Sequence, residues 1–211
     1  MMTVVCFDLD GTLIDSSFGI HASLKQACLQ EGVRPPDYEA LISCIGPPLG
    51  DYLPSLLNIS EKECQSILAA FRIHHDTVGF LDYRLYPGAK SVLSQLENNR
   101  HLLYAATNKP FAISSAALRH FGLLERFLNV YCPDGSVYPS GLHDHSKRTV
   151  LTHLRLCSDP ANVVYVGDTV SDQVAATEAN VGFIHAAYGY GCGILSEQRI
   201  DTLSGLLSLI R

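Results

Sequence analysis

Two aspartates, Asp8 and Asp10, follow directly on the first apolar segment of the chain. Residues 3–7 before them are apolar or β-branched, which predicts a buried strand, and Gly11 with Thr12 predicts a turn. In a parallel α/β sheet, ligands bind outside the carboxyl ends of the strands. Side-chain alternation would aim both acids at one ligand, and a cation or a shared proton would have to relieve their repulsion. Taken alone, the Asp-Gly pair is equally typical of an acidic turn with an N-cap.

Two later apolar segments also end in polar residues. Residues 102–106 are followed by Thr107, Asn108 and Lys109, and residues 163–166 by Gly167, Asp168 and then Asp172. Both segments have the length and apolar character of buried strands. Because parallel strands present their carboxyl ends at one edge, the sequence predicts that these side chains gather with Asp8 and Asp10.

This ordered set resembles the haloacid dehalogenase superfamily of phosphohydrolases, and the resemblance covers nearly the whole chain. The matching motifs are Asp8-x-Asp10-Gly11-Thr12-Leu13, Thr107-Asn108, a lysine, and Gly167-Asp168-x-x-x-Asp172. Three further segments resemble the phosphoglycolate-phosphatase-like branch, which has a helical cap. They are the loop that begins at Gly46, the pair Phe71-Arg72, and the run that ends at Gly88. The resemblance implies a doubly wound, Rossmann-like α/β core.

The spacing of the motifs predicts an insertion in this core. Asp8 and Thr107 are 99 positions apart, whereas a strand-helix-strand unit needs roughly 30 residues. The excess has helical signals, including the capping box Ser60-x-x-Glu63 and apolar residues at helical spacing after it. We therefore expect an α-helical cap over residues 16–82, and a catalytic core over residues 1–15 and 83–211. A last strand is expected at residues 182–188 and a tail helix near residues 202–210.

The resemblance assigns catalytic roles to three residues. Asp8 would be the nucleophile that forms an aspartyl-phosphate, and Asp10 the acid and then the base. Lys147 would offset the charge of Asp8 and the phosphate, although Lys109 is the alternative for this third motif. Superfamily members that cleave carbon–halogen bonds generally lack the second aspartate, so Asp10 disfavours a dehalogenase.

The resemblance also implies a magnesium cofactor and a phosphate site. Mg²⁺ typically binds one or two carboxylates together with substrate phosphate. Its ligands would be the Asp8 carboxylate, the Asp10 carbonyl and Asp168, with Asp172 holding metal-bound waters, while Thr107 and Asn108 would bind the phosphoryl group. Cap residues Gly46, Pro47 and Arg72 would contact the substrate, although Arg72 is equally compatible with a structural ion pair.

Composition narrows the class of partner. The net charge of −6 argues against a nucleic-acid or anionic-membrane surface, and no apolar run is long enough to span a bilayer. Seven scattered cysteines without a Cys-x-x-Cys motif favour a reducing, cytoplasmic setting. The resemblance implies a small phosphorylated metabolite as the substrate, and we expect a monomer or homodimer. A phosphomutase and a non-catalytic phosphate-binding regulatory protein remain the alternatives.

Three other polar clusters have simpler explanations. Residues 143–145 (His-Asp-His) provide too few ligands for a closed metal site, and residues 74–76 (His-His-Asp) are typical of a solvated helix end. Residues 188–191 (Tyr-Gly-Tyr-Gly) are compatible with a loop close to the active site and equally with a bare turn.

Overall fold

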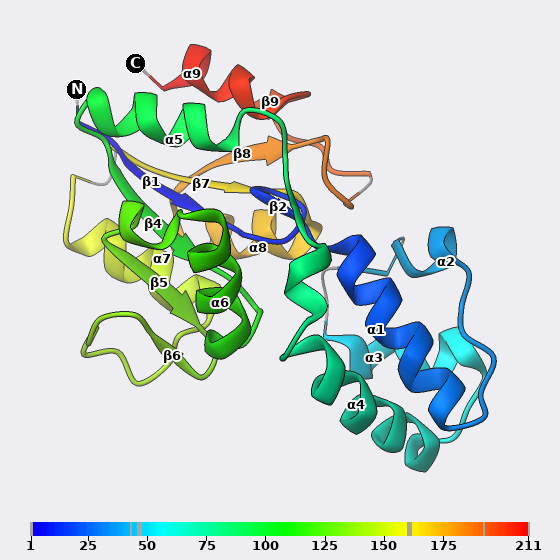
Figure 1. Cartoon of the computed structure of the whole chain (residues 1–211). Helices are drawn as coiled ribbons and strands as arrows, with labels where there is room; N and C mark the ends of the chain where they lie inside the picture. The colour runs from blue at the N-terminus through cyan, green and yellow to red at the C-terminus, as the bar shows by residue number, and fades with distance from the viewer. Residues whose placement is uncertain (1, 43, 46–47, 160–161, 192, 211) are drawn as a thin grey trace. The chain divides into compact units, whose positions relative to one another are not determined.

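The computed structural model describes residues 2–42, 44–45, 48–159, 162–191 and 193–210. The chain divides into two compact units, one of residues 1–15 with 85–211 and the other of residues 16–84. The first unit contains a large β-sheet, and the second is helical (Figure 1).

The sheet of the first unit has seven strands in the order β6-β5-β4-β1-β7-β8-β9. The central strand β1 (Val4–Phe7) pairs in parallel with β4 (Leu102–Ala106) and with β7 (Val163–Gly167). The outer strands are β5 (Asn129–Cys132), β8 (Gly182–Ala186), β9 (Arg199–Ile200) and the short antiparallel β6 (Gly135–Ser136). Phe7 is level with Ala105 and Val166, so the residues that follow these three strands emerge at the same edge.

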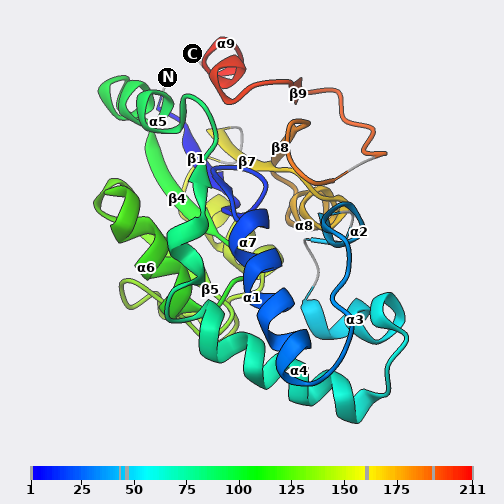
Figure 2. The ribbon, with the colours of Figure 1, turned by 45° about the vertical axis from the view of Figure 1, so that its right-hand side comes forward.

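Helices cover both faces of this sheet, as expected for a doubly wound fold. Helices α7 (Lys147–Leu156) and α8 (Val170–Ala179) pack together over a buried cluster that contains Tyr165. Helix α5 (Ala89–Asn98) lies with α9 (Leu206–Leu209) on the other side, and α6 (Phe111–Phe121) packs on β5 (Figures 1 and 2). The α/β fold with a mainly parallel sheet is therefore confirmed.

The carboxyl-terminal region differs from the sequence prediction. The strand expected over residues 182–188 ends at Ala186, because the chain turns there and the Gly189 N–H donates to the Ala186 carbonyl at 3.1 Å. The edge strand β9 was not predicted, since two residues are too few to give a periodic signal. The tail is a 3₁₀ turn, Leu203–Gly205, followed by α9, rather than one helix.

The second unit contains the predicted helical insert. Its helices are α1 (Ser17–Gln30), α2 (Tyr38–Ile42), α3 (Leu49–Leu57) and α4 (Glu61–His75), followed by a 3₁₀ turn, Gly79–Asp82. The capping box at the start of α4 is confirmed, because Ser60 and Glu63 each accept the other's backbone N–H. Strands β2 (Ile14–Asp15) and β3 (Arg84–Leu85) pair where the chain passes between the units.

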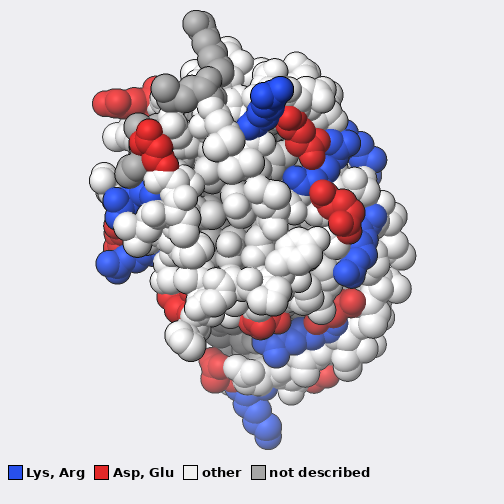
Figure 3. Space-filling model, turned by 90° about the vertical axis from the view of Figure 1, so that its left-hand side faces the viewer, with Lys and Arg blue, Asp and Glu red and all other residues white. Residues whose placement is uncertain are grey.

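Charge is mixed on the face shown in Figure 3, where Lys and Arg side chains are interspersed with Asp and Glu. That face has no continuous basic patch of the kind that binds nucleic acid. Among the described helices, none combines the length and the apolar character needed to cross a membrane.

Candidate active site

Asp8 lies immediately beyond β1, and only 5% of its surface is exposed. Its backbone N–H donates to the Val166 carbonyl at 2.9 Å, which continues the pairing with β7. Its Oδ1 atom accepts the Leu9 N–H at 2.7 Å. The strand end therefore holds Asp8 in one orientation, with Oδ2 directed to a second partner.

That partner is Lys147, the first residue of α7. Its Nζ atom lies 2.8 Å from Asp8 Oδ2 and 2.7 Å from Asp172 Oδ1. Burial opposes the charged form of the ammonium, but the two carboxylates outweigh burial and raise the pKa of Lys147. Lys147 therefore stays charged and links the carboxyl end of β1 to the first turn of α8.

Asp172 is held on both of its oxygens. Oδ1 lies 3.0 Å from the Tyr165 hydroxyl as well as near Lys147, and Oδ2 accepts the Thr169 hydroxyl at 2.6 Å and the Thr169 N–H at 3.0 Å. Burial alone would raise the pKa of Asp172, but the Lys147 ammonium and the hydrogen bonds from Thr169 lower it. Asp172 is thus an ionised carboxylate that fixes the position of Lys147.

A second lysine, Lys109, forms an ion pair with Asp10. Lys109 Nζ lies 3.0 Å from Asp10 Oδ2, and the lysine side chain is 7% exposed. The two lysines that compete for the third motif therefore contact different acids, Lys147 the first and Lys109 the second. Asp10 Oδ1 is buried and has no hydrogen-bond partner among the described residues.

Asp168 follows β7 and is fully buried. Its Oδ2 atom accepts the Tyr190 N–H at 2.7 Å, while Oδ1 has no hydrogen-bond partner in the described part of the chain. A Cβ at Gly11, which has φ +77°, would overlap the Asp168 carboxylate, and one at Gly191 would overlap its carbonyl oxygen. Only glycine permits these close approaches.

The buried acids form a potential cation site. One carboxylate oxygen from each of Asp8, Asp168 and Asp172 lies within 4.8 Å of the others. Burial, opposed by Lys147 and reinforced by Asp172, raises the pKa of Asp8 to about 7. Burial and the two other carboxylates raise that of Asp168 to about 8. Oxygen ligands suit Mg²⁺, and Asp168 Oδ1, which has no partner among the described residues, is where a cation would be needed. These residues therefore fit a divalent metal.

The predicted phosphate-binding residues lie at the end of β4. Thr107 is buried, and its Oγ1 atom accepts the Lys109 N–H at 3.2 Å. Asn108 is exposed. The turn after β4 therefore carries the buried Thr107 hydroxyl and the exposed Asn108 directly before Lys109, which pairs with Asp10.

The predicted cap residues belong to the second unit. Arg72 is exposed on α4, whereas Gly46 and Pro47 lie outside the described residues.

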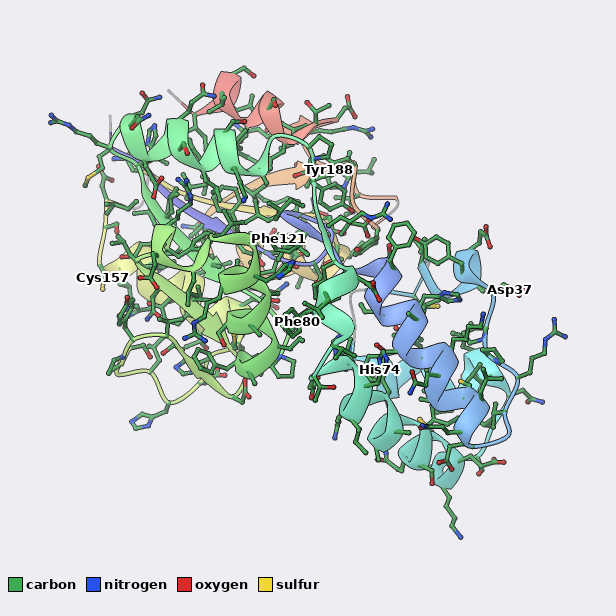
Figure 4. All side chains as sticks on the ribbon, in the orientation of Figure 1. Asp37, His74, Phe80, Phe121, Cys157 and Tyr188 are labelled. Atoms are coloured by element: carbon green, nitrogen blue, oxygen red, sulfur yellow. The ribbon has the colours of Figure 1, made fainter. Side chains whose placement is uncertain are left out.

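The two histidine clusters have structural partners. Asp144 accepts hydrogen bonds from Ser146 and Thr149 at the start of α7, and His145 bonds to the Ser140 hydroxyl at 2.9 Å. His74, on the insert in Figure 4, lies 3.0 Å from the Ser23 hydroxyl. The expectation of a solvated helix end is wrong for His75, which is buried against Phe71 and bonded to the Tyr83 hydroxyl. Within the described part of the chain, neither cluster brings three metal-ligating groups together.

A family comparison agrees with the sequence resemblance. The model of the haloacid dehalogenase-like hydrolases matches residues 5–186, which include every acid of the site. The chain belongs to this family.

Individual relatives of this haloacid dehalogenase-like hydrolase carry different names. A 5'-nucleotidase of Pseudomonas aeruginosa is 30% identical over 89% of this chain and 83% of its own. A phosphoglycolate phosphatase of Cereibacter sphaeroides is 28% identical over 90% of this chain and 87% of its own. The solved structure of Mycobacterium tuberculosis protein tyrosine kinase A (PtkA) is 27% identical, covers 99% of this chain and 97% of its own, and has a TM-score of 0.80.

Sequence reasoning missed several residues of this hydrolase's site. Tyr165 reads as an ordinary buried strand residue. The loop of residues 188–191 was considered as a neighbour of the site, but the contact of Tyr190 with Asp168 is made by its backbone, which side-chain chemistry does not reveal. Thr169-x-x-Asp172 was detectable, because a threonine three residues before an acid is a helix-start pattern.

Proposed function

We propose that this protein is a Mg²⁺-dependent phosphatase that hydrolyses small phosphomonoesters through an aspartyl-phosphate on Asp8. The observation that carries the proposal is the contact of Lys147 with both Asp8 and Asp172. A buried carboxylate that is fixed at a strand end and paired with a cation is suited to nucleophilic attack on a dianion.

The chain's own groups account for the proton and bond changes. Asp8 Oδ attacks phosphorus, the ester bond breaks, and Asp10 gives a proton to the leaving oxygen. Asp10 then takes a proton from the water that attacks the aspartyl-phosphate, and phosphate leaves with Asp8 restored. Thr107 and the Asn108 N–H would bind phosphoryl oxygens during both steps.

The buried acids would hold the metal. Asp8 and Asp168 would bind it together with the Asp10 carbonyl, and Asp172 would hold metal-bound waters. When bound, Mg²⁺ supplies positive charge that neutralises the phosphate and the mutually repelling carboxylates. It also favours the ionised form of Asp8, which nucleophilic attack requires.

We infer a small substrate, of which phosphoglycolate is one candidate. Support comes from the phosphoglycolate phosphatase and 5'-nucleotidase relatives and from the helical insert, a domain type that can cover a site and exclude water. Gly46, Pro47 and Arg72 are the proposed specificity residues. A phosphomutase would use the same Asp8 chemistry, and a regulatory protein would bind phosphate without turnover.

The deciding experiment measures phosphate release from phosphoglycolate, nucleoside monophosphates, sugar phosphates and a phosphotyrosine peptide, with and without Mg²⁺. Asp8→Asn, checked for folding by circular dichroism, is the matched inactive variant, since an amide is a very poor nucleophile. Mg²⁺-dependent release from a small substrate supports the proposal. Isomerisation of a sugar phosphate would indicate a phosphomutase. Phosphate binding without phosphate release would indicate a regulatory protein. Equal catalytic efficiency on the phosphotyrosine peptide and on the best small substrate would contradict selection of small substrates.

A further inference from the structure

Three tyrosines gather beside the site, where the first unit connects with the insert. Tyr86 precedes α5, while Tyr188 and Tyr190 follow β8; Figure 4 labels Tyr188 at the end of that strand, near the segment that leads into α5. The ring centroids of Tyr86 and Tyr188 are 4.8 Å apart, and Tyr190 lies two residues beyond Tyr188 on the same loop. We call these three residues the tyrosine cluster.

The cluster holds the segment that leaves the core. The Tyr188 hydroxyl donates to the Thr12 carbonyl at 2.8 Å, and the Tyr190 hydroxyl donates to Asp15 Oδ1 at 2.9 Å. Asp15 is the last residue of the first unit before the insert begins.

The cluster also holds the segment that returns. Tyr86 lies directly after Leu85, where the first unit resumes, and its N–H donates to the Leu13 carbonyl at 3.1 Å. The Tyr188 and Tyr190 hydroxyls therefore hold the outgoing linker, and the ring of Tyr188 also packs against Tyr86 on the returning linker.

The backbone of the same loop fixes Asp168. The Tyr190 N–H donates to Asp168 Oδ2, and Gly189 and Gly191 on either side leave no room for a Cβ against Asp168. One loop thus contacts a proposed metal ligand through its backbone and both linkers through its side chains.

We propose that Tyr86, Tyr188 and Tyr190 are positioning residues that couple the orientation of the Asp168 carboxylate to the conformation of the two linkers. The coupling is physical: a shift of either linker moves a tyrosine, and the tight glycine contacts transmit that movement to Asp168. The effect of this coupling on activity rests on the proposed phosphatase function. Its effects on Mg²⁺ binding and on hydrogen exchange can be measured without turnover.

The first test is a double-mutant cycle on the Tyr190–Asp15 hydrogen bond. Tyr190→Phe removes one hydroxyl and leaves the N–H to Asp168 intact, and Asp15→Ala removes its partner. We expect each variant to raise the Mg²⁺ concentration for half-saturation roughly tenfold, as for other residues that orient metal ligands. The double variant should be no worse than the worse single one. Half-saturation is measured by calorimetric Mg²⁺ titration as well as by activity.

The second test is hydrogen exchange of peptides that cover residues 12–16 and 84–88. Tyr190→Phe should accelerate exchange in both peptides, and Mg²⁺ should slow it in the wild type more than in the variant. Tyr138→Phe, which alters an exposed tyrosine on the same unit, should leave all values unchanged. Tyr188→Phe, which should act in the same direction, replaces Tyr190→Phe if the latter does not fold.

Additive effects in the cycle, or wild-type Mg²⁺ binding and exchange in a folded Tyr190→Phe protein, would overturn the coupling. Absence of phosphate release by the wild type would refute the proposed function instead, because the calorimetric and exchange measurements need no turnover.

Discussion

Lys147 Nζ lies 2.8 Å from Asp8 Oδ2, although the two residues are 139 positions apart in the chain. The contact exists because α7 begins at Lys147 and points its first residue at the end of β1. It leaves Lys109 to pair with Asp10. The two lysines therefore have separable effects on the proposed reaction.

Lys147→Ala is expected to lower kcat/KM by at least about 10³-fold, since the ammonium stabilises charge that develops on Asp8 and the phosphate. Lys109→Ala should cost roughly tenfold, because its partner is Asp10 and its effect is on positioning. Steady-state kinetics measure both losses against the control Lys90→Ala, which alters an exposed lysine. Melting temperatures verify that the three variants are folded. A larger loss for Lys109→Ala would show that Lys109 is the third-motif lysine.

Asp10→Asn is expected to slow hydrolysis in proportion to the basicity of the leaving group. An alkyl phosphate, whose leaving oxygen needs a proton, should lose about 10²- to 10⁴-fold in phosphoenzyme formation, and nitrophenyl phosphate much less. Rapid-quench measurement of phosphoenzyme formation separates this step from hydrolysis of the intermediate. Equal losses on both substrates would argue that Asp10 is not the acid.

EDTA is expected to abolish activity and Mg²⁺ to restore it, because Asp8 and Asp168 are buried carboxylates that repel each other without a cation. Asp168→Ala should sharply raise the Mg²⁺ concentration needed, whereas Glu178→Ala, which removes an exposed carboxylate at the far end of α8, should not. Ca²⁺ should inhibit, since its looser coordination misaligns the reacting groups. Full activity after exhaustive dialysis against EDTA would refute the metal assignment.

The fold was predictable where local pattern and tertiary position agree. Residues 102–106 and 163–166 are apolar, end in polar residues, and form the central strands beside β1 as expected. The capping box at Ser60 was readable for the same reason, since it is local. Edge strand β9 was not, because its pairing with β8 depends on neighbours that a two-residue pattern does not encode.

The sequence predicted which residues form the site better than it predicted which of them contact each other. The resemblance assigned Lys147 to Asp8, and the structure has that contact. The sequence did not indicate that the alternative, Lys109, pairs with Asp10 instead, because that contact depends on where the turn before α6 lies in space. The loop of residues 188–191 was one of two readings of the Tyr-Gly-Tyr-Gly run, but its contact with Asp168 was not predictable, since it follows from glycine contacts between distant loops.

His185 gives a prediction about stability that is independent of catalysis. It is 3% exposed in β8, and neither ring nitrogen has a hydrogen-bond partner among the described residues. Burial, together with the positive charge of Arg199, lowers its pKa below the usual 6.5 despite the opposing charge of Asp201. The folded protein therefore holds the neutral imidazole.

Because its folded pKa lies below the unfolded value of about 6.5, the unfolded chain binds a proton more readily, and stability must fall as pH drops below that value. For this one group the free energy of unfolding should fall by up to about 1.4 kcal/mol per pH unit until the folded pKa is reached. Urea denaturation of wild type and His185→Leu between about pH 5.5 and pH 7.5 measures the difference, in which other titrating groups cancel. His143→Gln, at an exposed site, should keep the wild-type slope. If His185→Leu also keeps it, His185 is not the group responsible.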